Sequence, residues 1–253
     1  MKHLTILTGA SRGMGLAMAR QLLTPDATLV CISRQHNAVL EREARQTGAT
    51  LEQWTLDLAE GAQAAARLGN WLDAQDPPAI ASVTLINNAG VISSLVPLHD
   101  AAPGDLAYAL RVGLEAPLQL CAAFLAATRG WPMPRKVLNI SSGLGRRAMA
   151  SSSAYCAAKA GLDHFTRCMA LDEARLVNGA KVCSLAPGVV DTDMQIQLRG
   201  ADIAAFPDQG AFAGLHSQGE LTSPAQAAKR ILRYLAQPGF GCIPVADIRE
   251  VAT

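Results

Sequence analysis

Short, continuously apolar stretches alternate with longer stretches of helical periodicity along almost the whole chain. Strands buried on both faces have this apolar character, and strands that alternate with helices form a parallel sheet with helices on both sides. The expected strands are Leu4–Thr8, Ala27–Ile32, Leu51–Leu56, Val83–Ile86, Lys136–Ile140, Lys181–Leu185 and Cys242–Val245. The expected helices are Met14–Leu23, Val39–Gln46, Ala62–Ala74, Leu106–Thr128, Ala154–Arg175 and Pro224–Leu235. The sequence therefore predicts an α/β fold, a doubly wound parallel sheet of about seven strands.

No repeat and no low-complexity linker divides the chain, so we predict one domain over residues 1–253. Residues 193–220 are an exception to the regular pattern, because glycine and proline interrupt them between scattered large apolar side chains. A segment of this length without clear periodicity is typical of a functional loop. We therefore expect a mobile lid over the substrate at residues 193–220.

The charges of the chain nearly cancel, since 22 lysines and arginines face 21 aspartates and glutamates. This balance argues against a nucleic-acid-binding surface. No uninterrupted apolar run approaches the roughly 20 residues of a membrane helix, and the N-terminus lacks the pattern of a signal peptide. Six cysteines without CxxC spacing and five histidines without metal-ligand spacing predict reduced thiols and no metal. We expect a cytoplasmic protein with no membrane or nucleic-acid partner.

A glycine-rich turn, Thr8–Gly15, joins the first expected strand to the first expected helix. Gly9, Gly13 and Gly15 would let the backbone turn tightly and approach a pyrophosphate at the helix N-terminus, where free N–H groups favour anions. The spacing is GxxxGxG rather than GxGxxG, so the turn alone is also compatible with an ordinary strand–helix connection. Its position between a strand and an amphipathic helix favours dinucleotide binding.

The residues after the second expected strand indicate which dinucleotide binds. A dinucleotide without a 2′-phosphate usually meets an acidic residue about 20 residues after the glycine turn. Here the sequence reads Ser33-Arg34-Gln35, and no acidic residue follows before Glu41. Arg34, together with Arg12 of the glycine turn, suits a 2′-phosphate and predicts NADP(H) rather than NAD(H). The alternative is that Arg34 is a solvated loop residue.

Three residues in the second half of the chain suit proton transfer to a carbonyl group. Tyr155 and Lys159 are four residues apart in an expected helix, so they share one face. A phenol has a pKa of about 10, and a neighbouring ammonium group lowers it by favouring the phenolate. Ser142 closes the fifth expected strand, where its hydroxyl could hold the carbonyl oxygen of a substrate. The YxxxK pair alone is common, and a pair on an amphipathic surface is the alternative.

Together these motifs resemble the short-chain dehydrogenase/reductase family over almost the whole chain, which implies a Rossmann fold. The resemblance implies that Ser142, Tyr155 and Lys159 are catalytic. It implies that the cofactor is bound by Gly9, Ser11, Arg12, Gly13, Met14, Gly15, Arg34, Asp57, Leu58, Asn88, Ala89, Gly90, Tyr155, Lys159, Pro187, Gly188, Val190 and Thr192. The adenine would contact Asp57 and Leu58, and residues 187–192 would cover the nicotinamide.

Two further stretches, residues 187–195 and the tail at residues 247–250, are similar to the sepiapterin reductase and benzil reductase branch of that family. The resemblance implies NADPH-dependent reduction of a ketone or aldehyde. The apolar character of the expected lid indicates a hydrophobic substrate, such as a 1,2-dicarbonyl or a pterin side chain. The expected substrate contacts are Ser142, Leu144, Met149, Tyr155, Met194 and Asp247. Asp247 would bind a polar group, as the equivalent acid binds the pterin in sepiapterin reductase, or is a solvated acid.

The sequence departs from the family at one catalytic position. The family has an asparagine in the long helix before the fifth strand, and the matching position here is Gly113. In the family this position contributes its main-chain carbonyl to a relay water. Pro117, four residues later, has no N–H, so the Gly113 carbonyl would be free to accept from water. Alternatively, Gly113 only allows close helix packing, and the proton relay is impaired.

The missing asparagine leaves a second function open, that of a non-catalytic NADP(H)-binding sensor or scaffold. A sensor would need none of Ser142, Tyr155 and Lys159, which argues against it. A third interpretation, an alcohol dehydrogenase that works with NAD, is disfavoured by Arg34. The resemblance also implies a homodimer or homotetramer that pairs through the two long helices.

Overall fold

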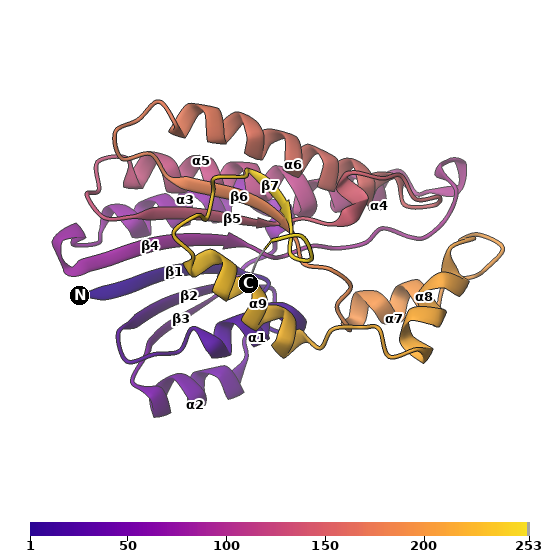
Figure 1. Ribbon diagram of the computed structural model, residues 1–253, viewed down its shortest axis with the longest axis horizontal. Coiled ribbons are helices and arrows are strands. Elements are labelled where there is room, and N and C mark those ends of the chain that lie inside the picture. The colour runs from indigo at the N-terminus through magenta and orange to yellow at the C-terminus, as the bar shows by residue number, and fades with distance from the viewer. Residues whose placement is uncertain (252–253) are drawn as a thin grey trace.

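The computed structural model describes residues 1–251 and contains a fully parallel, seven-stranded sheet (Figure 1). The strands are β1 (Lys2–Thr8), β2 (Ala27–Ser33), β3 (Thr50–Thr55), β4 (Ile80–Asn87), β5 (Arg135–Ile140), β6 (Lys181–Ala186) and β7 (Val245–Asp247). Their order in the sheet is β3-β2-β1-β4-β5-β6-β7, and all neighbouring strands run parallel. The predicted doubly wound sheet, a Rossmann fold, is confirmed.

Helices cover both faces of the sheet (Figure 1). One layer contains α3 (Gly61–Asp73), α4 (Pro103–Leu110), α5 (Ala116–Thr128) and α6 (Ser153–Glu173). The opposite layer contains α1 (Gly13–Gln21), α2 (Ala38–Thr47) and α9 (Pro224–Ala236). Adjacent residues of β1 pack into different cores, because Ile6 belongs to the cluster with α3 and α5, and Leu7 to the cluster with α1 and α9. Burial on both faces explains why the strands are continuously apolar.

Capping residues set the ends of helix α2. The Asn37 side-chain oxygen accepts hydrogen bonds from the backbone N–H groups of Val39 (3.0 Å) and Leu40 (2.9 Å), which begins the helix. Gly48 ends it with a left-handed backbone at φ +76°. Asparagine is favoured at the start because its side chain accepts from the free N–H groups, and glycine at the end because it adopts a left-handed backbone without a Cβ penalty.

The last predicted strand, Cys242–Val245, is wrong, because β7 begins only at Val245. Gly241 has a φ of +82°, so the chain is still turning immediately before Cys242. Pro244 lacks the N–H that a strand needs for its ladder of hydrogen bonds. An apolar run that contains a turn and a proline therefore looks like a strand in sequence but becomes one only at its end.

The helix predicted over Leu106–Thr128 begins at Pro103 and contains a turn of π-helix at Arg111–Glu115. By length and composition alone, this helix is the one segment of residues 1–251 long and apolar enough to cross a membrane. Its buried residues, among them Leu120 and Phe124, pack in the core beneath α3, as those of a core helix do.

Residues 193–220, the expected lid, form two short helices rather than an unstructured loop. These are α7 (Asp193–Arg199) and α8 (Gln209–Ser217), which project beyond the carboxyl edge of the sheet in Figure 1. Between them Phe206 is fully buried, and its ring stacks on that of Phe212 with centres 5.8 Å apart. That this segment moves over a substrate remains a prediction.

The order of the strands places a crevice at the middle of the sheet. The chain proceeds from β1 towards β3 in one direction and from β4 towards β7 in the other. The loops after β1 and β4 therefore diverge at the carboxyl ends of these adjacent strands. Open α/β sheets bind their ligands at such a topological switch point.

Candidate active site

A cavity of about 540 Å³ lies at this crevice, along the carboxyl ends of the central strands. Its wall contains every residue that the resemblance assigned to the cofactor. Of the expected substrate contacts, the wall contains Ser142, Leu144, Tyr155, Met194 and Asp247. Met149 is not on the wall, because it is buried in the apolar cluster behind Leu144 and Tyr155. Cavities of this size hold small ligands and cofactors.

The cavity wall also contains residues that the sequence analysis did not single out. They include Val91, Ile92, Tyr108 and Arg147. No local spacing links these residues to the glycine turn or to the YxxxK pair. Only the fold brings them to the site, where Val91 and Ile92 add to the apolar lining.

The glycine turn has a shape that larger residues would disrupt. Gly9 and Gly13 have left-handed φ values of +70° and +54°. A Cβ on Gly15 would lie 2.0 Å from the carbonyl oxygen of Gly9, and one on Gly9 would lie 2.9 Å from the Cα of Ala89. Arg12 at the N-cap makes no side-chain capping bond, so no side chain at this position caps the backbone N–H groups in the first turn of α1, which lines the cavity. This cradle fits the pyrophosphate of a dinucleotide.

Thr8 ties the glycine turn to the loop after β4. Its hydroxyl oxygen accepts hydrogen bonds from the backbone N–H groups of Asn88 (2.9 Å) and Ala89 (3.0 Å). The Asn88 side-chain amide donates to the carbonyl oxygens of Thr8 (3.0 Å) and Gly9 (3.3 Å). The two loops on either side of the crevice are therefore held together by the chain's own hydrogen bonds.

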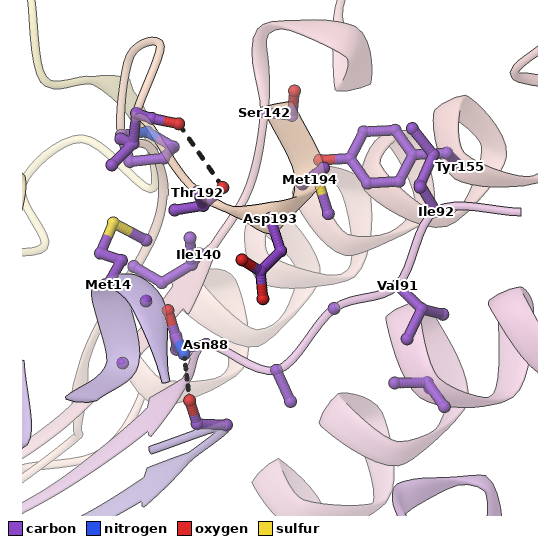
Figure 2. Close-up of a pocket in the computed structure, with 18 of the residues that line it drawn as sticks. Met14, Asn88, Val91, Ile92, Ile140, Ser142, Tyr155, Thr192, Asp193 and Met194 are labelled. Atoms are coloured by element: carbon purple, nitrogen blue, oxygen red, sulfur yellow. Dashed lines mark hydrogen bonds between the residues drawn. The ribbon is translucent and has the colours of Figure 1, made fainter. Parts of the chain in front are cut away.

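Ser142, Tyr155 and Lys159 meet on one side of the cavity. Figure 2 shows the Tyr155 ring and Ser142 on the wall, next to Met194. Lys159 lies one helical turn after Tyr155 on α6, with its Nζ 5.7 Å from the centre of the Tyr155 ring. That nitrogen donates a hydrogen bond of 2.7 Å to the carbonyl oxygen of Ile140 at the end of β5. The arrangement places a hydroxyl, a phenol and an ammonium group around one point.

Burial dominates the electrostatics of these groups. It lowers the pKa of Lys159 to about 8, and the negative charge of Asp163 opposes this shift. Burial raises the pKa of Tyr155, and a side-chain hydrogen bond with Ser142 opposes that shift. The sequence analysis expected the ammonium group to lower the pKa of the phenol, but in the protein alone the desolvation of the phenolate is the larger effect. Tyr155 is therefore protonated at neutral pH, which suits a proton donor.

The two arginines expected at a 2′-phosphate have different partners. Arg12 Nη1 lies 2.6 Å from Asp193 Oδ2, which pairs its charge with the first residue of α7. Figure 2 shows the Asp193 carboxylate pointing into the cavity. Arg34 instead donates from Nη1 to the Tyr108 hydroxyl at 3.0 Å and forms no ion pair within residues 1–251. The uncompensated positive charge at this end of the cavity therefore lies on Arg34.

Asp247 is held by arginine. Arg249 contacts both carboxylate oxygens, Oδ1 at 2.8 Å and Oδ2 at 2.7 Å, and these bonds lower the pKa of the acid. Arg146 lies 3.9 Å from the same carboxylate and 3.3 Å from the buried Asp163. Asp247 is only 3% exposed, so the interpretation as a solvated acid is wrong. Its hydrogen-bonding oxygens are already engaged by Arg249.

Gly113 lies in the π-helical turn that interrupts the long helix. It is buried, and a Cβ at this position would lie 3.0 Å from the Cβ of Ala158, the neighbour of Lys159 on α6. This contact supports the view that glycine allows close packing of the two helices. That the Gly113 carbonyl serves a water relay stays a prediction, and both roles are compatible at one residue.

Metal and thiol chemistry find no support at the site. Within residues 1–251, no group of three or more histidine, cysteine, aspartate or glutamate residues is arranged to hold a metal ion. All six cysteines are free, and Cys31, Cys121 and Cys183 are buried. Burial raises the pKa of Cys31 and Cys121 to about 12, which leaves them as unreactive thiols.

Comparison with known proteins agrees with this geometry. The family described as short chain dehydrogenase matches residues 3–202, which is most of the chain. The protein therefore belongs to the short-chain dehydrogenase/reductase family, whose members bind nicotinamide cofactors and act as oxidoreductases on carbonyl or alcohol groups.

Individual relatives place the chain in the branch that the sequence resembles. A benzil reductase ((S)-benzoin forming) from Bacillus cereus is 34% identical over 235 residues, which cover 93% of this chain and 94% of that protein. A sepiapterin reductase from Meriones unguiculatus is 31% identical, covering 93% of this chain and 92% of the relative. A crystal structure of a short-chain dehydrogenase/reductase from Burkholderia vietnamiensis is 35% identical, covers 99% of both chains and superposes with a TM-score of 0.66.

Proposed function

We propose that the protein reduces a ketone or aldehyde with NADPH, by hydride transfer to the carbonyl carbon and proton transfer from Tyr155. The observation that carries the proposal is the meeting of Ser142, Tyr155 and Lys159 at the cavity that the glycine cradle opens into. The glycine turn supports a dinucleotide because Cβ atoms on Gly9 and Gly15 would clash with the backbone at Ala89 and Gly9, so only glycine permits this tight approach at the helix N-terminus. Because the chain belongs to the short-chain dehydrogenase/reductase family, we expect these three residues to act on a carbonyl group.

Each of the three side chains has a distinct task. A nicotinamide cofactor held in the cavity would supply the hydride. The Ser142 hydroxyl oxygen accepts from the N–H of Leu144 at 3.1 Å, and its proton, which is shared with Tyr155 in the free protein, would turn to the carbonyl oxygen of the substrate. Tyr155, which is protonated at neutral pH as an ordinary phenol is, would give its proton to that oxygen as the alcohol forms. Lys159 binds the ribose and stabilises the phenolate that remains.

The preference for NADPH follows from the charge at the end of β2. Arg34 occupies the place where an acid would hydrogen-bond the 2′-hydroxyl of NAD(H), and no carboxylate within residues 1–251 neutralises it. A guanidinium group binds phosphate through parallel N–H bonds. The 2′-phosphate of NADPH would supply the negatively charged partner that Arg34 lacks.

The substrate end of the cavity favours an apolar dicarbonyl compound. Its wall near Tyr155 is formed by Ile92, Leu144, Met194, Leu198 and Phe212. A pterin would need the Asp247 carboxylate as a hydrogen-bond acceptor, and it would have to share that carboxylate with Arg249, which contacts both oxygens. Among the substrates suggested by the resemblance, the structure therefore favours a hydrophobic 1,2-dicarbonyl over a pterin side chain.

The proposal is tested by the consumption of NADPH, followed by absorbance, with benzil, sepiapterin and simple ketones. Tyr155→Phe should abolish turnover and keep NADPH binding, because it removes the proton and little else. Tyr234→Phe is a matched control, since Tyr234 lies on α9 and is not part of the cavity wall. Turnover retained by Tyr155→Phe refutes the assignment, and NADPH binding without turnover of any carbonyl compound favours the sensor.

We also propose that the protein is a homodimer or homotetramer that pairs through the long helices. Exposed apolar side chains on these helices, Leu118 on α5 and Leu171 on α6, support this proposal. Light scattering of the purified protein measures the assembly. A monomer at all concentrations contradicts it.

A further inference from the structure

Arg34 and Tyr108 both line the cavity and meet there from distant parts of the chain. Arg34 follows β2, Tyr108 belongs to α4, and 74 residues separate them in the chain. Their side chains are joined by a hydrogen bond of 3.0 Å from Arg34 Nη1 to the Tyr108 hydroxyl. Both line the cavity next to Asp57 and Leu58. Since β1 and β4 lie between β2 and β5 in the sheet, the bond lies on the β2 side of the cavity, away from Ser142 at the end of β5.

The Tyr108 ring is a firm anchor for this bond. It packs against the apolar core formed by α3, α5 and the sheet, whereas Arg34 is a long side chain at an exposed position. A free arginine loses considerable rotamer entropy when a ligand fixes it. A partner that already holds the guanidinium group over the cavity removes part of that loss before the ligand arrives.

The chemistry of the partner matters as much as its position. A tyrosine hydroxyl is neutral and accepts one of the five N–H groups of the guanidinium, so the positive charge and the other donors remain available. The contrast is Arg12, which is paired with the Asp193 carboxylate at 2.6 Å and therefore carries a compensated charge. A carboxylate at position 108 would fix Arg34 equally well but would cancel the charge that a phosphate needs.

We infer that Tyr108 is a positioning residue that holds Arg34 for the 2′-phosphate of NADPH and so contributes to the discrimination between NADPH and NADH. This inference rests on the proposed use of NADPH. It assigns no contact between Tyr108 and the phosphate, because the hydroxyl acts through Arg34.

The test is a double-mutant cycle on the full chain. The proteins are the wild type, Tyr108→Phe, Arg34→Ala and the double variant, with Tyr234→Phe as a control for the loss of a tyrosine hydroxyl elsewhere. Phenylalanine keeps the ring that packs on the core and removes only the hydrogen-bonding group. The measured quantities are the dissociation constants of NADPH and NADH by fluorescence titration.

Tyr108→Phe should weaken NADPH binding about three- to tenfold, the range expected for one lost hydrogen bond, and should leave NADH binding within about twofold of the wild type. In the Arg34→Ala background, Tyr108→Phe should have no further effect. The control variant should bind both cofactors as the wild type does.

Each other outcome overturns a defined part of the argument. If Tyr108→Phe weakens the binding of NADPH and NADH equally, Tyr108 only contacts the adenine that both cofactors share. An undiminished effect of Tyr108→Phe in the Arg34→Ala background means that the hydroxyl binds the phosphate directly. No effect of Tyr108→Phe, with a large effect of Arg34→Ala, refutes the positioning role alone. No effect of Arg34→Ala refutes the proposed NADPH preference itself.

Discussion

Lys159 should reduce the stability of the folded protein at neutral pH, because its charged form is buried. Its pKa falls from 10.5 to about 8 in the folded protein, with burial as the largest cause. One pKa unit corresponds to roughly 1.4 kcal/mol, so near neutral pH the buried charge costs about 3 kcal/mol of unfolding free energy. Lys159→Met removes this cost together with the hydrogen bond to Ile140, worth about 1 kcal/mol. We expect the variant to be more stable by about 2 kcal/mol and inactive.

The stability difference should depend on pH in one direction. Below a pH of about 8, Lys159 is charged in both the folded and the unfolded state, so the whole cost is present. Between about 8 and 10.5 the folded protein has released a proton that the unfolded chain still binds, so the stability of the wild type rises with pH. The advantage of Lys159→Met should therefore shrink through this interval, and above it the wild type should be the more stable by about 1 kcal/mol, the value of the hydrogen bond to Ile140.

Urea unfolding followed by circular dichroism measures the effect at about neutral pH and again near the upper end of this interval. Lys229→Met on α9 is the control, because this lysine is exposed and its replacement removes a charge without relieving burial. The reasoning is refuted if Lys159→Met is less stable than the wild type at neutral pH. It is equally refuted if the stability difference is the same at both pH values.

Three further substitutions test the cradle, the helix contact and the arginine pair. Gly15→Ala should abolish NADPH binding in a fluorescence titration, because the added Cβ would lie 2.0 Å from the Gly9 carbonyl oxygen, and normal binding would contradict the cradle. Gly113→Asn should lower the midpoint of thermal unfolding, because its Cβ would lie 3.0 Å from the Cβ of Ala158. It should not raise turnover, and a large gain in turnover would exclude a proton relay through the main-chain carbonyl of Gly113. Asp193→Asn should tighten NADPH binding about two- to fivefold, because it frees Arg12 and removes a negative charge from the cavity. An unchanged dissociation constant would show that the Arg12–Asp193 ion pair does not compete with the cofactor.

The sheet could be predicted because its strands carry their own signal. Ile6 and Leu7 are both fully buried, on opposite faces, so the local run of apolar residues reports the parallel sheet directly. The same signal misplaced β7, because a turn at Gly241 and the missing N–H of Pro244 shift the start of the strand without changing its apolar character. Hydropathy records burial, and the position of a strand's end depends on backbone geometry.

The parts of the candidate site that are close in sequence could be predicted, and those joined only by the fold could not. Tyr155 and Lys159 share a helical face by their spacing alone. The partners of Arg12 and Arg34 lie 181 and 74 residues away, at Asp193 and Tyr108, and no periodicity connects them. The pKa of Tyr155 could not be predicted for the same reason. The spacing of Tyr155 and Lys159 led us to expect a lowered pKa, but the burial that raises it depends on the folded structure.

The segment of residues 193–220, which we propose as the substrate lid, is held differently at its two ends. At the cofactor end, the methyl group of Thr192 lies 3.6 Å from where a Cβ on Gly13 would be, and Asp193 binds Arg12. At the other end, Phe206 is fully buried in the apolar cluster that contains Tyr155. A ligand phosphate that draws Arg12 away from Asp193 therefore releases the α7 end and leaves the end at Phe206 packed. Cofactor binding would then free the α7 end of the segment before the carbonyl compound enters.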